Sequence, residues 1–289
     1  MIEVLDPGPQ ALVQDLGRPG LAAIGVGRSG AADRASLCLG NRLLANDEGA
    51  AGVEILLGGF AARAHTDLLV ALTGAPAPAT VDGRPVGHQA HVRLRRGQEL
   101  RLGPPPAGLR TYLCVRGGIA VPPVLGARST DVLSGIGPEP LEKGAELPIG
   151  PEPEAYPVID YAPVAPPAAG LVTLRAISGP HAEHAVDPGA LATSRWVASG
   201  RTDRVGMRLE GAALEVAEGA GSLPSEGLTR GAIQLPPGGE PVVFLADHPV
   251  TGGYPVIAVL RDADVDRAAQ IRPGQPVRIT LSRENTWRT

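Results

Sequence analysis

Lysine is almost absent from this chain of 289 residues. Lys143 is the only one, although lysine and arginine together number 26. Schiff-base catalysis and a phosphate-binding P-loop both need a lysine. Lys143 stands in a turn context with no phosphate-loop glycines before it, and no methionine flanks it as at a biotin attachment site. The sequence therefore argues against all three kinds of site in this chain.

Cysteines, aromatic residues and long apolar runs are also scarce. Cys38 and Cys114 lie far apart in apolar surroundings, which indicates buried thiols of a reducing cytoplasm. No N-terminal segment has the pattern of a signal peptide, and no apolar run approaches the roughly 20 residues of a membrane helix. Aromatic residues make up 3% of the chain, and the net charge is -4 without a basic cluster. We therefore expect a cytoplasmic protein with no membrane or nucleic-acid partner.

Turn-forming residues are abundant, with 39 glycines and 30 prolines. Short apolar runs between them predict a mainly β chain with barrel or sandwich character and a few short helices. A Pro-rich, aperiodic stretch predicts a linker at 151–169, between an N-terminal lobe at 1–150 and a C-terminal lobe at 170–289. The expected strands are Ile2–Leu5, Ala11–Gln14, Val53–Leu57, Leu68–Thr73, Val81–Asp82, His91–Leu94, Glu99–Leu102, Thr111–Val115, Leu171–Arg175, Trp196–Ser199, Ala232–Leu235, Val242–Ala246, Val256–Leu260 and Val277–Leu281.

The best helix candidate begins after a glycine-rich segment and ends at about Ala45. Ser29 or Asp33 can cap its N-terminus, where backbone N–H groups also favour anions. An ordinary cap is the simpler interpretation, and a part in binding an anion is the functional one. A second short helix is expected at Asp264–Ile271.

Arginines in glycine-bounded turns are candidate anion-binding groups. Arg128 precedes Ser129 and Thr130, and the three residues form either an anion clamp or a solvated turn. Arg204 follows Asp203 in a segment that we interpret as a charged turn. Arg204 or Arg208 can bind a carboxylate or phosphate, with Asp203 holding the guanidinium in place, and the alternative is a structural ion pair between the lobes.

The densest polar stretch runs over 225–236 and 247–255, around two short apolar strands. Rigid strands hold such loops still, so this is where we expect a site. A tight turn between strands is the structural alternative.

Two His-x-x-His pairs are candidate metal ligands. They are His88 with His91 and His181 with His184. Neither has a cysteine or an obvious third ligand nearby, so we expect no metal site.

The ordered motifs identify a resemblance that runs nearly end to end. The chain resembles the family called allophanate hydrolase subunit 2, also known as the biotin-dependent carboxyltransferase family and as the C subunit of bacterial 5-oxoprolinase. The matching segments are Gln14–Gly20, Ser29–Asp33, Gly117–Ile119, Arg128–Thr130, Asp203–Leu209, Ser225–Gly227, Gly231–Pro236, Thr251–Pro255 and Gln270–Gly274.

This resemblance implies two cyclophilin-like β-barrel lobes in tandem and a function within a complex. Members pair with a small subunit like allophanate hydrolase subunit 1. With that subunit and a third one they resemble the ATP-dependent 5-oxoprolinase, which opens 5-oxo-L-proline to L-glutamate. The ATP site would lie in this chain or in a partner subunit. The same module is similar to the carboxyltransferase region of urea carboxylase, which moves a carboxyl group from biotin to urea.

The resemblance also implies site residues. Catalytic roles fall to Glu226 as the acid or base, to Gln234 and Tyr254 as hydrogen-bonding groups for the amide, and to Asp203. Substrate- or anion-binding roles fall to Arg204, Arg128, Ser29, Asp33, Thr251 and Gly253.

The chain departs from the family pattern at two places. His248-Pro249-Val250 replaces an expected Arg-Gln-Thr-like triplet, and Thr202-Asp203 stands where a Ser-Asn or Ser-Asp pair is commoner. The first departure affects nucleotide or carboxyl handling, and the second puts a charge where a neutral amide is expected.

Three functions stay open at this point. The leading one is a subunit of a 5-oxoprolinase-like hydrolase. The second is a biotin-dependent carboxyltransferase acting on urea or a related amide, with the carboxylase and biotin carrier supplied by other chains. The third is a non-catalytic antagonist of a partner subunit that inhibits a kinase.

Overall fold

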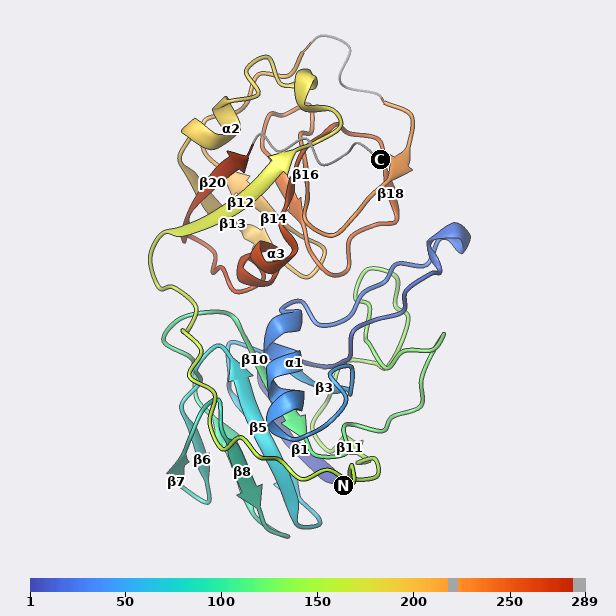
Figure 1. Ribbon diagram of the computed structural model, residues 1–289, viewed down its shortest axis with the longest axis vertical. Coiled ribbons are helices and arrows are strands. Elements are labelled where there is room, and N and C mark those ends of the chain that lie inside the picture. Colours follow the sequence, from blue (N-terminus) through green and yellow to red (C-terminus); the bar gives the residue numbers. More distant parts are fainter. Residues whose placement is uncertain (218–222, 283–289) are drawn as a thin grey trace. The chain divides into compact units, whose positions relative to one another are not determined.

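The computed structural model describes residues 1–217 and 223–282. Its contacts divide the chain into two compact units (Figure 1). The first unit contains Met1–Pro19 and Ser29–Pro167, and the second contains Gly20–Arg28 and the chain from Ala168 onward. No helix in the ranges described is long and apolar enough to cross a membrane.

Two antiparallel sheets with a common core form the first unit. The six-stranded sheet has the order β11-β1-β4-β9-β6-β7, and the five-stranded sheet has the order β2-β3-β10-β5-β8. Side chains from both sheets, such as Val4 and Leu113, belong to one buried apolar cluster. The strands are β1 (Ile2–Pro7), β2 (Gln10–Gln14), β3 (Gly52–Leu56), β4 (Phe60–Ala64), β5 (Leu68–Gly74), β6 (Ala79–Val81), β7 (Arg84–Val86), β8 (His91–Leu94), β9 (Glu99–Leu102), β10 (Arg110–Val115) and β11 (Glu146–Leu147).

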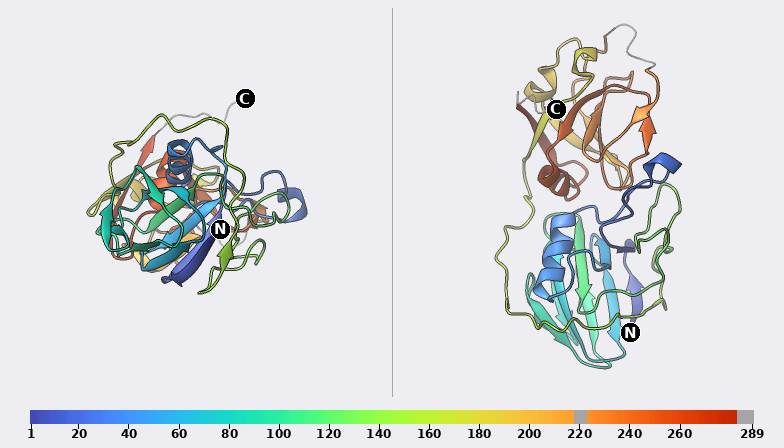
Figure 2. Two further views of the ribbon diagram at one scale, coloured as in Figure 1. Left: turned by 90° about the horizontal axis from the view of Figure 1, so that it is seen from below. Right: turned by 45° about the vertical axis from the view of Figure 1, so that its right-hand side comes forward.

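Helix α1 (Arg34–Leu43) covers the second face of the five-stranded sheet (Figures 1 and 2). Successive residues of a strand point to opposite faces. In β10, Leu113 therefore joins the core between the sheets, while Tyr112 and Cys114 join the cluster beneath α1. This explains why β10 is buried on both faces throughout its length.

The predicted helix is confirmed, and Asp33 is its N-cap. The Asp33 carboxylate accepts hydrogen bonds from the Ser36 backbone N–H (3.0 Å) and from the Ser36 hydroxyl (2.6 Å). Ser29 lies before the helix with a left-handed backbone (φ 53°), and its hydroxyl donates to the Thr130 carbonyl (3.2 Å). Capping at Asp33 satisfies backbone donors that the first turn leaves unpaired.

The second unit is built on a closed barrel with the strand order β12-β19-β16-β17-β14-β13-β20. The pair β12–β20 is parallel, and the other pairs of neighbouring strands in the barrel are antiparallel. The barrel strands are β12 (Val172–Ser178), β13 (Trp196–Thr202), β14 (Gly206–Glu210), β16 (Ala232–Gln234), β17 (Val242–Phe244), β19 (Val256–Leu260) and β20 (Pro276–Ser282).

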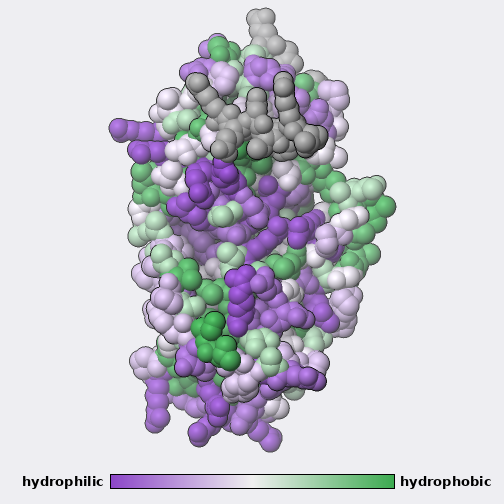
Figure 3. Space-filling model, in the orientation of Figure 1, coloured by the Kyte–Doolittle hydropathy of each residue, from purple (hydrophilic) through white to green (hydrophobic). Residues whose placement is uncertain are grey.

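Short elements decorate this barrel. A two-stranded ladder joins β15 (Glu226–Gly227) to β18 (Thr251–Gly252). The helical segments of the second unit are η1 (Ala22–Ile24), η2 (Ala182–His184), α2 (Ala190–Thr193) and α3 (Asp262–Ala268). On the face shown in Figure 3, hydrophilic residues are spread among apolar ones, as expected where the apolar side chains of each unit are gathered in its own core.

The segment that we interpreted as a charged turn is mostly strand. β13 extends to Thr202 and β14 begins at Gly206, so the turn is confined to 203–205. In β14, Met207 and Leu209 are buried and alternate with Arg208 and Glu210. The alternation is that of a strand with one face in the core, and the charged residues obscured it.

The Pro-rich stretch before Ala168 lies along the first unit. The Gln89 side chain donates to the Val164 carbonyl (2.9 Å) and accepts from the Val164 N–H (3.0 Å). The Arg116 guanidinium donates to the carbonyls of Pro153 (2.6 Å) and Ala155 (2.8 Å). These bonds attach the stretch to the first unit at two places.

Candidate functional site

The ladder β15–β18 brings together several residues that the sequence had singled out. Glu226 pairs with Gly252, and Gly227 pairs with Thr251. Gly253 and Tyr254 follow directly after β18. Glu226, Thr251, Gly253 and Tyr254 are therefore neighbours, although up to 28 residues of sequence separate them.

Gln234 supports this ladder from the adjoining barrel strand. Its side-chain amide donates to the Tyr254 carbonyl (3.0 Å), and the residue is buried. A Cβ at Gly252 would lie 2.8 Å from Gln234 Nε2, so the glycine permits this close approach. The Tyr254 side chain is exposed. The amide of Gln234 thus positions the backbone that carries Tyr254.

His181 is the partner of Glu226, which the sequence did not reveal. His181 Nε2 lies 2.8 Å from Glu226 Oε2, and the His181 backbone N–H donates to the Val256 carbonyl (3.1 Å). A histidine and a carboxylate in contact can hold and pass a proton, because imidazole titrates near neutral pH. The two residues are 45 positions apart, so no local spacing signals the pair.

Asp203 and Arg204 take different partners. The Asp203 carboxylate accepts from the backbone N–H groups of Val205 (2.8 Å) and Gly206 (3.0 Å), which shapes the turn between β13 and β14. Arg204 is buried and donates from Nε and Nη2 to the two oxygens of Asp247 (2.8 and 3.0 Å). An incoming anion would have to displace that carboxylate. The ion pair of Arg204 lies within the second unit, so the alternative of a pair between the lobes is wrong for this residue.

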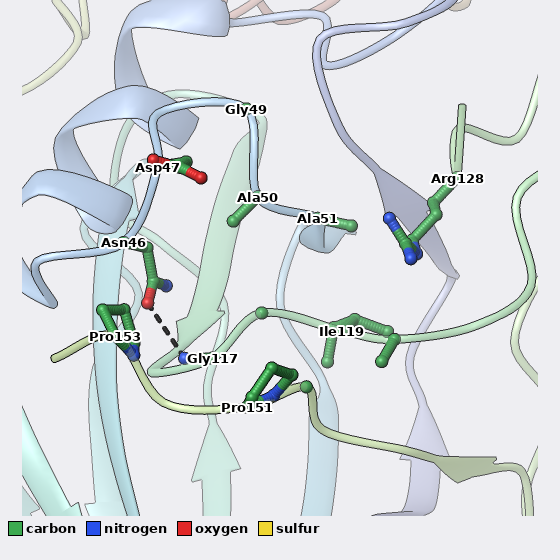
Figure 4. A pocket seen from close by; sticks show the side chains of 13 residues that line it. Asn46, Asp47, Gly49, Ala50, Ala51, Gly117, Ile119, Arg128, Pro151 and Pro153 are labelled. Carbon is green, nitrogen blue, oxygen red and sulfur yellow. Dashed lines mark hydrogen bonds between the residues drawn. The ribbon is translucent and has the colours of Figure 1, made fainter. Parts of the chain in front are cut away.

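In the first unit, Arg128 borders a cavity of about 370 Å³ (Figure 4). Its backbone N–H donates to Asp15 Oδ2 (2.6 Å), and its Nε donates to the Val121 carbonyl (2.8 Å). The side chain lies across the cavity from Asp47. Pockets of roughly 300–1,000 Å³ are typical of small-molecule sites. The lining residues are Asn46, Asp47, Gly49, Ala50, Ala51, Gly117, Gly118, Ile119, Ala120, Arg128, Gly150, Pro151 and Pro153.

The sequence did not assign Asn46 or Asp47 to a site. Asn46 Oδ1 accepts from the Gly117 N–H (2.9 Å), and Asn46 Nδ2 donates to the Val115 carbonyl (2.8 Å). Gly117 and Gly118 have left-handed backbones (φ 91° and 69°). The Gly117–Ile119 motif was the sequence signal for this loop, because a left-handed backbone strongly favours glycine.

Asp33 adjoins a buried polar cluster under α1. Its backbone N–H donates to the Tyr112 hydroxyl (2.8 Å), and that hydroxyl donates to Glu54 Oε2 (2.7 Å). Glu54 also accepts from the Ala32 N–H (2.9 Å) and pairs with Arg110 (3.3 Å). Burial, and then the charges of Glu54 and Asp33, raise the pKa of Tyr112 well above its ordinary value. The cluster ties the start of α1 to β3 and β10.

Comparison with known proteins agrees with the motifs. The family described as carboxyltransferase domain, subdomain A and B, matches residues 24–281. The chain belongs to this family. It is similar to the 5-oxoprolinase C subunit of Escherichia coli (strain K12), with 37% identity over 96% of this chain and 90% of that protein.

Two solved structures share the family's fold. The structure of TTHA0988 superimposes with a TM-score of 0.87 and 35% identity, covering 96% of this chain and 55% of that one. The K. lactis urea amidolyase gives a TM-score of 0.90 and 28% identity, covering 97% of this chain and 18% of that one. The chain therefore spans about half of the first protein and less than a fifth of the second.

Proposed function

We propose that this chain is a subunit of an ATP-dependent, 5-oxoprolinase-like amidohydrolase that converts 5-oxo-L-proline to L-glutamate. It would act with a small partner like allophanate hydrolase subunit 1 and with a third 5-oxoprolinase subunit. One observation carries the proposal: the alignment with the E. coli protein covers 96% of this chain and 90% of that protein. A nearly complete subunit supports a shared role better than a match to a small part of a large enzyme does.

The reaction requires proton transfer and hydrogen-bond donors to a carbonyl oxygen. A lactam is resonance-stabilised, so its ring opens when water attacks an activated carbonyl and the leaving nitrogen gains a proton. The Glu226–His181 pair fits the proton transfer, because the two groups share a contact of 2.8 Å. Tyr254 and Thr251, both exposed, are the proposed donors to the substrate amide. Gly253 is proposed to lie against the substrate between them.

The remaining candidates keep more limited roles. Arg128, at the cavity of the first unit, is proposed to hold an anionic group such as a carboxylate. Ser29 and Asp33 would act through the loop that they brace before α1. Arg204, Asp203 and Gln234 are proposed to position the loops around the second unit's site, since each is bonded to protein groups.

The residues described do not form a lysine-containing phosphate loop. Lys143 is exposed in a turn just before β11. We therefore propose that ATP is bound with a partner subunit, and the roles given to Glu226 and His181 do not depend on where it binds.

Glutamate release from 5-oxoproline and ATP tests the proposal, with the chain co-purified with both partner subunits. Glu226→Gln and His181→Gln should each lower the rate by about 10²–10⁴-fold while the complex stays intact. Glu240→Gln is the matched control, because Glu240 is an exposed acid of the same unit paired with Arg201. No release from a stable, complete wild-type complex would contradict the hydrolase function. Wild-type rates in the Glu226 variant would contradict only the site.

A biotin-dependent carboxyltransferase is the second candidate. The family description and the TM-score of 0.90 with the urea amidolyase favour it. Biotin would have to arrive on a separate carrier protein. Carboxylation of urea by this chain, given a carboxylase and a biotinylated carrier, would support that function over hydrolysis of 5-oxoproline.

A further inference from the structure

Three potential metal ligands converge at η2, between β12 and α2 of the second unit. One ring nitrogen of His181, one carboxylate oxygen of Glu183 and one ring nitrogen of His184 all lie within 4.8 Å of one another. The short helical turn explains this, because residues three apart in sequence come to the same side of it. The third ligand that the His-x-x-His spacing did not reveal is the glutamate between the two histidines.

His184 supplies an additional reason to look for a ligand here. Its Nδ1 atom is buried and has no hydrogen-bond partner among the residues described. Glu183 Oε1 lies 3.4 Å from it as a possible ion-pair partner, but the two atoms do not form a hydrogen bond. Buried ring nitrogens are normally satisfied, so this one calls for a water, a proton partner or a metal ion.

The distance between two of these atoms suits a tetrahedral metal site. Bonds of roughly 2.0–2.2 Å to nitrogen and oxygen place neighbouring ligand atoms roughly 3.4 Å apart, which is the separation of His184 Nδ1 from Glu183 Oε1. The two imidazoles meet edge to face, with centroids 5.4 Å apart and planes at 85°. Lone pairs lie in the ring planes, so rings in this arrangement can direct two nitrogens to one point without stacking.

Glu226 completes the surroundings of the cluster. Its Oε2 is 2.8 Å from His181 Nε2. Metal-binding histidines usually donate their other ring N–H to a carboxylate, which orients the ring and raises its basicity. With Nε2 bonded to Glu226, Nδ1 is the ring atom of His181 that has a lone pair for a metal.

The other His-x-x-His pair provides a contrast within the same chain. His88 Nε2 lies 3.2 Å from the Gly74 carbonyl, and His91 Nε2 lies 3.0 Å from Asp160 Oδ1. His88 Nδ1 is also buried without a hydrogen-bond partner. In the part of the chain that the structure describes, neither histidine joins a group of three potential ligands. The convergence, and not the spacing alone, distinguishes η2.

We propose that His181, Glu183 and His184 bind a divalent transition-metal ion of the Zn²⁺, Co²⁺ or Ni²⁺ class, with Glu226 orienting His181. Two imidazoles select these ions over Mg²⁺ and Ca²⁺, which prefer oxygen ligands. The ion would link η2 to β15 through the bond between His181 and Glu226. This proposal goes beyond the hydrolase function and does not rest on it. A metal-bound His181 cannot also accept a proton, so in the metal-bound protein the proton transfer proposed above would fall to Glu226.

Metal titration of untagged protein tests the site, since a polyhistidine tag would itself bind these ions. Protein stripped with a chelator and then freed of it is titrated with Zn²⁺ in a calorimeter and with Co²⁺ in a spectrophotometer. We expect one equivalent to bind, with the visible absorption of Co²⁺ in a tetrahedral site. His184→Ala should weaken binding by at least 100-fold, and Glu226→Gln by about 10–100-fold.

The matched control is His91→Ala, which should leave the metal affinity unchanged. Glu183→Gln is a second test with little risk to folding, because the Glu183 side chain is 68% exposed. It should also weaken binding, and circular dichroism without metal checks that each variant folds. Absence of stoichiometric binding, or equal affinity in the wild type and in the His184 and Glu183 variants, would overturn the proposal.

Discussion

Arg204 and Asp247 form a bidentate ion pair in the interior of the second unit. Arg204 Nε lies 2.8 Å from one carboxylate oxygen, and Nη2 lies 3.0 Å from the other. The exposed fractions of the two side chains are 2% and 0%. The Asp247 N–H also donates to the Arg204 carbonyl (2.9 Å). The pair therefore joins the turn after β13 to the loop that leads into β18.

Removing one member of this pair should destabilise the second unit strongly. Arg204→Ala leaves the Asp247 carboxylate buried without its two guanidinium bonds, and we expect a loss of about 3–5 kcal/mol in the free energy of unfolding. Arg201→Ala is the matched control, because its pair with Glu240 is exposed and worth about 0–1 kcal/mol. Urea unfolding measures both. Equal losses in the two variants would show that burial of the ion pair does not determine the loss in the free energy of unfolding.

The two-stranded ladder that contains Glu226 has one glycine in crowded surroundings, Gly252, and one in open surroundings, Gly227. A Cβ at Gly252 would lie 2.8 Å from both Gln234 Nε2 and Leu228 Cδ1, whereas one at Gly227 would meet nothing within 4 Å. Gly252→Ala should cost about 1–3 kcal/mol and disturb the bond from Gln234 to Tyr254. Gly227→Ala should change stability by less than about 1 kcal/mol. Thermal unfolding compares the two, and a tolerated Gly252 variant would argue against the close packing.

The Tyr112 hydroxyl holds the start of α1 to the sheet. It accepts from the Asp33 N–H and donates to Glu54, and Tyr112→Phe leaves both groups without that partner. We expect a loss of about 1–3 kcal/mol. Tyr161→Phe is the control, because Tyr161 is 58% exposed. Denaturant melts of both variants give the comparison. A Tyr112 variant as stable as the control would mean that water replaces the hydroxyl.

The buried thiol of Cys114 should make stability depend on alkaline pH. Burial, with a smaller effect from Cys38, raises the pKa of Cys114 from 9.0 to about 12. Above pH 9 the thiol ionises in the unfolded chain but not in the folded one, so ionisation stabilises the unfolded state alone. The free energy of unfolding should therefore fall as pH rises from 9 toward 12.

A Cys114→Ala variant should show a shallower decline over this range, whatever its stability at neutral pH. Iodoacetamide gives an independent measurement, because the thiolate is the reacting form. Cys114 should stay unmodified in native protein near pH 9 and react once urea unfolds the chain. Rapid alkylation of native Cys114 would contradict the raised pKa.

Local sequence patterns predicted much of the secondary structure. The strands at His91–Leu94, Glu99–Leu102 and Val256–Leu260 match the structure, because each is apolar or alternating and is bounded by turn residues. The strand Phe60–Ala64 was missed because three of its five residues are alanine, which has little preference for strands. The two-residue strands β15 and β18 are too short to show any periodicity.

Pairings over long sequence distances could not be predicted in this way. Leu174 of β12 lies opposite Ile279 of β20, a register that depends on tertiary packing and not on either segment alone. The same holds for the sites. The loops around Glu226 and Thr251 were predicted from their polar residues, but His181 and Asp247 reach their partners through the fold. The roles assigned to individual site residues stay predictions.

The last strand of the barrel, β20, is the one that closes the second unit. β20 pairs with both β12 and β13, so it fills the gap between the unit's first two strands. During synthesis, those strands emerge from the ribosome more than 70 residues before β20 does, and each keeps an unpaired edge until then. Exposed strand edges attract other chains. The barrel of the second unit therefore cannot close until β20 has been synthesised, and the edges of β12 and β13 stay open to other chains until then.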